Sequence, residues 1–274
     1  MKAVEISGLS FTYETGDMTE IRALQDINLE VEAGKKVVFL GANGSGKTTL
    51  FYHLNGLHLP REGEVKILGI EVGKKSVKEV RRRVGMVFEN PDNQLISTTV
   101  YDDVAFGLRN YRWSEEAVQE KVQEALEKVQ AGDLAESSPY HLSWGQKKRV
   151  ALAGVLALEP EILVLDEPFS GLDPGVSGAL VSLLDRLNGE GKTVIAAAHD
   201  VDLAYRWADE VVILSRGQII NRGSPEILTV EEDMKEASLE VPVLAKIFEN
   251  TPYRPRSVEE ARAAIDKLVE GDTY

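Results

Sequence analysis

The sequence has 274 residues, enough for one large domain or for one domain with a small appendage. Of these residues, 43% are hydrophobic and 28% are charged, which is ordinary for a globular protein. It contains no cysteine, which excludes disulfide bonds and thiol chemistry. The net charge of −14 argues against nonspecific binding to nucleic acid or to an anionic membrane surface. The best candidate for a membrane span, VALAGVLAL at 150–158, stops at Glu159 and is too short.

The first elements along the chain are predicted to be β-strands. Residues 2–13 and 24–34 alternate apolar and polar side chains, which is the pattern of a strand with one buried face. Short apolar runs at 35–40, 161–168 and 192–200 predict buried strands, and the last two end in acidic or polar residues. Buried strands that alternate with helical segments indicate a parallel sheet in an α/β layer architecture.

The segment from about 76 to 160 is predicted to be largely helical and to be inserted between strands of the sheet. Within it, residues 114–133 have the pattern of an amphipathic helix, with Gly132 as the expected stop. The apolar face of this helix comprises Val118, Val122, Leu126 and Val129.

The C-terminal residues, about 226–274, are predicted to form an appended α-rich element. Ser257 and Glu260 have the spacing of a capping box at a helix start. The apolar stripe expected for that helix comprises Ala261, Ala264, Ile265 and Leu268.

The motif GANGSGKTT at 41–49 has the spacing of a phosphate-binding loop, and it follows a predicted strand and opens a predicted helix. Backbone N–H groups of such a loop point at the β- and γ-phosphates of a nucleotide. Lys47 would neutralise phosphate charge, and the Thr48 hydroxyl would reach Mg²⁺. The alternative is a glycine-rich turn before a helix. The loop residues expected to contact nucleotide are Asn43, Gly44, Ser45, Gly46, Lys47, Thr48 and Thr49.

Acidic residues and a histidine follow the two later buried strands. Asp166 can hold Mg²⁺, and Glu167 can orient and deprotonate an attacking water. His199 can contact the γ-phosphate, because the carboxyl ends of parallel strands meet at one edge of a sheet. The alternatives are two solvated acids and a structural histidine, and the phosphate loop favours the catalytic interpretation.

The stretch HLSWGQKKRV at 141–150 has two interpretations. Ser143 and Gln146 have the spacing of a capping box, so Ser143 can simply cap a helix at 144–158. The same helix N-terminus can also bind a phosphate, because its N–H groups are free and Gly145 permits close approach. Since the loop at 41–49 already accounts for one nucleotide, residue chemistry alone leaves both interpretations open.

A resemblance to a known family favours the second interpretation. The stretches LSWGQKKRVALAG (142–154) and LVLDEPFSGLDP (163–174) resemble the signature motif, Walker B motif and D-loop of ABC-transporter ATPases. The order of these motifs matches that family over residues 1 to about 225. The resemblance implies a P-loop NTPase core with a mixed sheet, an N-terminal antiparallel β part and a helical subdomain inserted at about 97–160. The remainder, 226–274, would be a small α-rich extension that contributes to dimerisation.

The resemblance also implies roles for individual residues. ATPases of this family pair head to tail, so Ser143, Gly145 and Gln146 would bind the γ-phosphate of ATP held by a second subunit. Tyr13 would stack on adenine. Asp166, Thr48 and Glu89 would hold Mg²⁺, with Glu89 in the Q-loop. Catalysis would depend on Glu167, His199 and Lys47.

Two further stretches resemble one particular subfamily of these ATPases. FENPDNQLISTTVYDDVAFGL (88–108) resembles the ATPases of energy-coupling-factor importers, including the cobalt/nickel type, and SLEVPVLAKIFE (238–249) resembles their C-terminal extension. This implies an ATP-hydrolysing motor subunit for metal-ion or vitamin uptake, peripheral on the cytoplasmic face of the membrane. Its partners would be integral membrane transporter subunits and a second ATPase, identical or paralogous, and not nucleic acid.

The sequence departs from the family pattern at two positions. Glu89 stands where a Q-loop usually has Gln, which adds negative charge near Mg²⁺ and the attacking water. Trp144 stands where the signature usually has Gly, and its side chain is expected to point away from phosphate. Two other functions remain open: a non-transport ABC ATPase, and a nucleotide-gated scaffold with weak hydrolysis.

Overall fold

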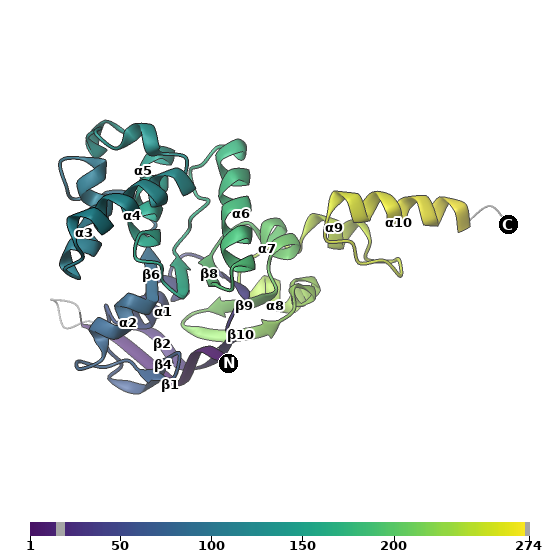
Figure 1. The fold of residues 1–274 in the computed structure, drawn as a ribbon. Helices are drawn as coiled ribbons and strands as arrows, with labels where there is room; N and C mark the ends of the chain where they lie inside the picture. The colour runs from purple at the N-terminus through teal and green to yellow at the C-terminus, as the bar shows by residue number, and fades with distance from the viewer. Residues whose placement is uncertain (15–19, 272–274) are drawn as a thin grey trace.

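The N-terminal part of the chain forms an antiparallel sheet in the computed structural model, which describes residues 1–14 and 20–271. The strand order is β2-β1-β4-β5, and this sheet lies at the bottom of the molecule in Figure 1. Buried and exposed side chains alternate along much of β1 and β2, which confirms the predicted one-sided strands. The strands are β1 (Lys2–Glu14), β2 (Glu20–Glu32), β4 (Glu62–Ile67) and β5 (Ile70–Glu71).

A second, six-stranded sheet has the order β10-β9-β3-β8-β7-β6. All neighbouring pairs are parallel except β10 with β9, so the sheet is mixed. Strands β7 and β8 are buried along their whole length, as expected for parallel strands covered on both faces. The strands are β3 (Lys36–Leu40), β6 (Val84–Val87), β7 (Ile162–Leu165), β8 (Thr193–Ala197), β9 (Glu210–Ser215) and β10 (Gln218–Gly223).

Strand β6 interrupts the segment 76–160, which the sequence predicts to be largely helical and which is helical over most of its length. Only the short helix α2 (Val77–Arg83) precedes it, and β6 then pairs with β7 in register Val84↔Ile162. A run of four residues is too short for its periodicity to separate strand from helix. Pairing with a strand almost eighty residues away therefore decides its conformation.

Three helices form the inserted subdomain, shown in teal at the top of Figure 1. They are α3 (Val100–Asn110), α4 (Glu115–Lys128) and α5 (Trp144–Leu156). Helix α4 buries Val118, Val122 and Leu126 as predicted, but it ends before the expected stop at Gly132. Gln130 has φ of +56°, a left-handed conformation that an α-helix cannot continue.

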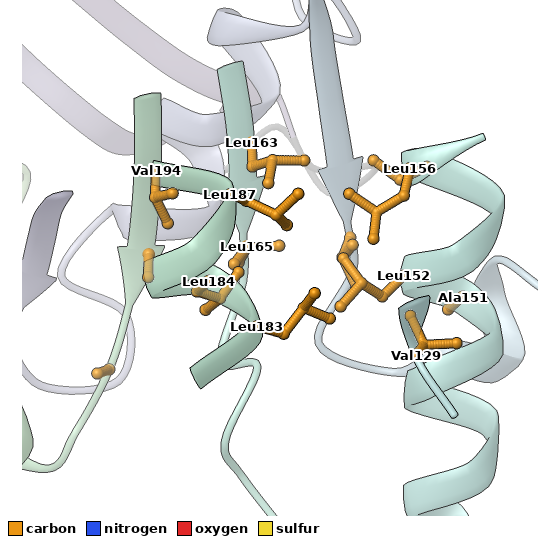
Figure 2. Close-up of a cluster of buried hydrophobic side chains, with 14 of the residues drawn as sticks. Val129, Ala151, Leu152, Leu156, Leu163, Leu165, Leu183, Leu184, Leu187 and Val194 are labelled. Atoms are coloured by element: carbon orange, nitrogen blue, oxygen red, sulfur yellow. The ribbon is translucent and has the colours of Figure 1, made fainter. Parts of the chain in front are cut away.

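The inserted helices pack on the sheet through a leucine-rich core (Figure 2). Leu152 and Leu156 of α5 lie on one side of this core, and Leu183 and Leu187 of α6 lie on the other. The remaining helices of residues 1–225 are α1 (Lys47–Leu54), α6 (Pro174–Gly189) and α7 (Val201–Trp207). No helix within 1–14 and 20–271 is long and apolar enough to cross a membrane.

The C-terminal extension contains α8 (Glu231–Glu236), α9 (Val243–Ile247) and α10 (Val258–Gly271), and Figure 1 shows the last two projecting from the rest of the molecule. The Ser257 hydroxyl accepts from the Glu260 N–H at 3.1 Å, as predicted. The reciprocal bond differs, because the Glu260 carboxylate accepts from the N–H of Arg256. The predicted apolar stripe is wrong at Ile265, which is 47% exposed, while the other three positions pack against Phe248 and its neighbours.

Candidate functional site

The phosphate loop follows β3 directly, and its first and last glycines are required by close contacts. Gly41 has φ of +153°, and a Cβ there would lie 2.2 Å from the Leu214 carbonyl oxygen. Gly46 has φ of +109°, and a Cβ there would lie 2.8 Å from the Ala23 carbonyl oxygen. Helix α1 begins at the next residue, Lys47. Only glycine fits both ends of the loop, which explains their spacing in the sequence.

Lys47 lies inside the curve of this loop. Its ammonium group donates to the carbonyl oxygens of Gly41 at 2.7 Å and Ala42 at 3.3 Å. Burial lowers the pKa of Lys47, although the carboxylates of Glu167 and Asp166 oppose this change. A buried ammonium held by neutral carbonyls is a site that an anionic phosphate would stabilise strongly.

Asp166 and Glu167 follow β7 and face the loop. The Thr48 hydroxyl donates to the Asp166 carboxylate at 2.7 Å. Burial raises the pKa of Asp166. Burial also raises the pKa of Glu167 to about 7; the positive charge of Lys47 opposes this increase, and the negative charges of Asp166 and Glu89 add to it. Glu167 also has φ of +48°, which is unusual for a residue other than glycine and is a strained conformation typical of functional sites.

His199 follows β8, the strand between β3 and β7, so strand order places it beside Glu167. Its Nε2 lies 3.1 Å from Oε1 of Glu167. The contact lacks hydrogen-bond geometry, so this buried oxygen has no hydrogen-bond partner within the ranges that the structure describes. Burial lowers the pKa of His199, and the charge of Lys47 adds to this effect. A carboxylate oxygen without a partner is available to accept a proton from water.

These residues line one cavity of about 430 Å³. The structure thus brings together the predicted nucleotide-contacting residues 43–49, Tyr13, Glu89 and the residues that follow β7 and β8. It adds three residues of β2 that the motifs did not indicate, because strand pairing places Ile21 opposite Tyr13 and Arg22 opposite Thr12. The lining is Tyr13, Ile21, Arg22, Ala23, Asn43, Gly44, Ser45, Gly46, Lys47, Thr48, Thr49, Glu89, Asp166, Glu167 and His199.

Tyr13 is held at the cavity by its hydroxyl group. The oxygen lies 3.2 Å from Thr49 Oγ1 and 3.1 Å from His58 Nε2. The ring packs edge-on against Phe11 and His58, with centroids 4.9 and 5.6 Å away. These contacts fix the ring where an adenine base could approach it, and His58 is a supporting residue that the sequence motifs did not indicate.

The signature residues lie outside this cavity. Ser143, Gly145 and Gln146 are absent from its lining. Ser143 and Gln146 form the predicted capping box at the start of α5, with the Ser143 N–H donating to the Gln146 side chain at 2.8 Å and the Gln146 N–H donating back at 3.3 Å. The hydroxyl of Ser143 therefore caps its own helix and does not reach the phosphate loop of the same chain.

Glu89, the predicted Q-loop residue, and the nearby Gln94 have different surroundings. Glu89 lines the cavity. The Gln94 side chain accepts from the Phe88 N–H at 3.2 Å and donates to the Ala151 carbonyl at 2.8 Å. Gln94 thus ties the Q-loop to helix α5, and Glu89 is the Q-loop side chain that faces the site.

The oxygen atoms near Thr48 fit a magnesium ion. Mg²⁺ in nucleotide sites takes one or two protein carboxylates together with substrate phosphates. Thr48 and Asp166 are already joined by a hydrogen bond, and Glu89 lines the same cavity. In residues 1–14 and 20–271 no three or more His, Cys, Asp or Glu side chains form a metal site by themselves.

The sequence matches the family model described as "ABC transporter" over residues 24–170. It is 44% identical to the energy-coupling factor transporter ATP-binding protein EcfA of Carboxydothermus hydrogenoformans, over 97% of this chain and 98% of that protein. It is 46% identical to the EcfA protein of Methanosphaera stadtmanae, over 90% of this chain and 88% of that protein.

The fold is also similar to solved structures of ABC cassettes. One is CbiO1 from Clostridium perfringens, described as part of the ABC transporter complex cbiONQ, with a TM-score of 0.74 and 36% identity over 90% of this chain and 99% of that chain. Another is the dimeric cassette MJ0796 bound to ADP and phosphate, with a TM-score of 0.75 and 30% identity over 81% of this chain and 98% of that chain. With a phosphate loop, Asp166, Glu167 and His199 at one cavity and these relatives along nearly its whole length, the chain belongs to the ATP-binding ATPases of ABC transporters.

Proposed function

We propose that this protein is the ATP-hydrolysing motor subunit of an energy-coupling-factor importer and works as a head-to-tail dimer. One observation supports the proposed dimer. The cavity is lined by residues 43–49 of the phosphate loop together with Glu167 and His199, but Ser143, Gly145 and Gln146 lie outside it. A signature helix that cannot serve its own site is suited to the site of a second subunit.

In this mechanism the chain mainly positions groups and stabilises charge. Lys47 binds the β- and γ-phosphates, and the loop N–H groups hold their remaining oxygens. Thr48, Asp166 and Glu89 would hold Mg²⁺, which neutralises developing phosphate charge when it is bound. Tyr13 packs against adenine, and Arg22 at the same cavity is a further cation available to the phosphates.

Glu167 is proposed as the general base. Water attacks the γ-phosphorus, the bond from that phosphorus to the bridging oxygen of ADP breaks, and Glu167 accepts the proton that the water loses. A base whose pKa burial raises to about 7 suits this task near neutral pH. His199, 3.1 Å from Glu167, would orient that carboxylate and contact the γ-phosphate.

The remaining roles follow from the relatives. Their names place them in energy-coupling factor transporters and in a complex called cbiONQ, so we propose that this subunit drives integral membrane partners from the cytoplasmic face. The cargo class is a metal ion or a vitamin, selected by the membrane subunits. The acidic chain, with a net charge of −14, is unsuited to nucleic acid.

The test is the solution mass of the Glu167→Gln variant by light scattering, with and without ATP. The chain is 30.2 kDa, and trapped ATP should double its mass. Adding Ser143→Arg should abolish the doubling while ATP still binds, because the arginine would disrupt only the trans contact. A mass that stays monomeric with saturating ATP would refute self-pairing, and wild-type protein with no turnover would refute the motor function.

A further inference from the structure

Trp144, which departs from the family pattern, contacts the D-loop (Ser170–Asp173) of its own chain. It is the first residue of α5, and its indole N–H points to the Ser170 carbonyl oxygen at 3.4 Å. Gly171 has φ of +72°, and a Cβ there would lie only 2.9 Å from the indole nitrogen. The D-loop therefore approaches the indole as closely as a glycine allows.

Lys148, one helical turn later, reaches the same loop from the same face of α5. Its ammonium donates to the carbonyl oxygens of Glu167 at 2.7 Å and Ser170 at 2.8 Å. It also lies 5.9 Å from the centre of the Trp144 ring, within range of a cation–π contact. Lys148 is only 5% exposed, and a buried ammonium is retained only where such partners compensate for its lost hydration.

The carbonyl held by Lys148 belongs to the residue with the strained backbone. Glu167 has φ of +48° and its side chain is the base in the proposed reaction. A strained conformation persists only where its surroundings fix it, and Lys148 bonds directly to the peptide group of Glu167. Its second bond holds Ser170, so both ends of the segment 167–170 are attached to α5.

We propose that Trp144 and Lys148 are positioning residues that clamp Glu167 and the D-loop to the signature helix. The inference rests on the proposed head-to-tail dimer. In that dimer the N-terminus of α5 faces the nucleotide of the partner, while Glu167 faces the nucleotide of its own chain. Closure of the partner's ATP site against the N-terminus of α5 then acts, through the clamp and across a single helix turn, on Glu167, which is the base of this chain's own site.

The first variants are Lys148→Met, which removes both donated bonds at similar length, and Lys148→Arg, which restores donors and charge. A small cavity of about 50 Å³, lined by Lys148 and Leu172, leaves room for the longer side chain. The matched control is Lys147→Met, because Lys147 pairs with Asp92 and is the neighbouring lysine on the same helix. Trp144→Ala tests the indole by itself.

Two readouts separate this inference from the proposed function. In nucleotide-free protein, amide hydrogen exchange over 167–173 should accelerate in Lys148→Met and Trp144→Ala, but not in the control, whether or not the protein dimerises. In steady-state assays, Lys148→Met should lose about tenfold or more in kcat, as expected when a charge-assisted hydrogen bond is removed, while its Kd for ATP changes by less than about threefold. Lys148→Arg should recover most of the rate.

The clamp would be overturned by a Lys148→Met variant with wild-type kcat or with unchanged exchange over 167–173. Faster exchange spread evenly over the whole chain would also overturn it, because Lys148 would then be only a residue of the core. If the loop loosens in these variants but the Glu167→Gln variant never dimerises, the clamp stands within one chain and the transfer between sites is refuted.

Discussion

Replacing Glu167 by Gln should stabilise the nucleotide-free protein, by an amount that depends on pH. Glu167 is 7% exposed, and burial raises its pKa from 4.5 to about 7. Since the folded pKa lies above the unfolded value, the native state binds the extra proton between these two pH values. The contribution of the protonated Glu167 side chain to stability is then fully present below pH 4.5 and is lost as the pH rises through 7.

The size of the effect follows from the shift in pKa. A change of about 2.5 units corresponds to about 3 kcal/mol, at 1.36 kcal/mol per unit. Glutamine carries no charge at any pH, so the unfolding free energy of Glu167→Gln at pH 8 should be about 3 kcal/mol higher than that of wild type. At pH 5 the advantage should fall below about 1 kcal/mol, because the wild-type side chain is then neutral when folded.

Urea unfolding at pH 5, 6, 7 and 8, without nucleotide or Mg²⁺, measures this difference. The control is Glu232→Gln, at an exposed position of α8, which should change stability equally little at each pH. An advantage of Glu167→Gln that is the same at pH 5 and pH 8 would refute the argument, because it would show that the buried carboxylate does not titrate between them. The confirmed result would mean that the site keeps its base at a cost in stability.

Two further predictions concern Glu89 and Arg256. The charge of Glu89 raises the pKa of Glu167. Glu89→Gln should therefore move the acid limb of the kcat/KM profile to lower pH, while the control Asp92→Asn should leave it in place. An acid limb that does not move in Glu89→Gln would contradict this prediction. Arg256 donates to the carbonyl oxygens of Tyr205 at 2.6 Å and Ala208 at 2.7 Å, at the end of α7. Arg256→Ala should therefore lower the unfolding free energy by about 2 kcal/mol and speed proteolysis of the extension, and equal proteolysis of both proteins would refute this role.

The sequence was sufficient where the physical requirement is local. The spacing of Gly41 and Gly46 identifies the phosphate loop from consecutive residues alone, although the carbonyl oxygens that exclude a side chain there belong to Leu214 and Ala23, far away in the sequence. The capping box of Ser143 and Gln146 involves only four consecutive residues, and it forms as predicted. The fully apolar runs before Asp166 and His199, rich in Ile and Val, favour buried parallel strands, and both form as predicted.

Other features needed contacts between distant parts of the chain. The strand order β3-β8-β7 places His199 between the phosphate loop and Glu167, and no local pattern specifies that order. Pairing of β1 with β2 brings Arg22 into the cavity, although no motif includes it.

The kinds of chemistry in this protein can be predicted from short motifs, because the phosphate loop, the buried strands and the helix caps each occupy a few consecutive residues. How these groups act on one another depends on the fold. In the sequence Lys148 is one of several cations in a basic stretch, and only the fold shows that its ammonium donates to the carbonyl oxygen of Glu167. The reason is that burial and long-range pairing set the pKa of Glu167 and the path from α5 to the D-loop, and both depend on residues far apart in the chain.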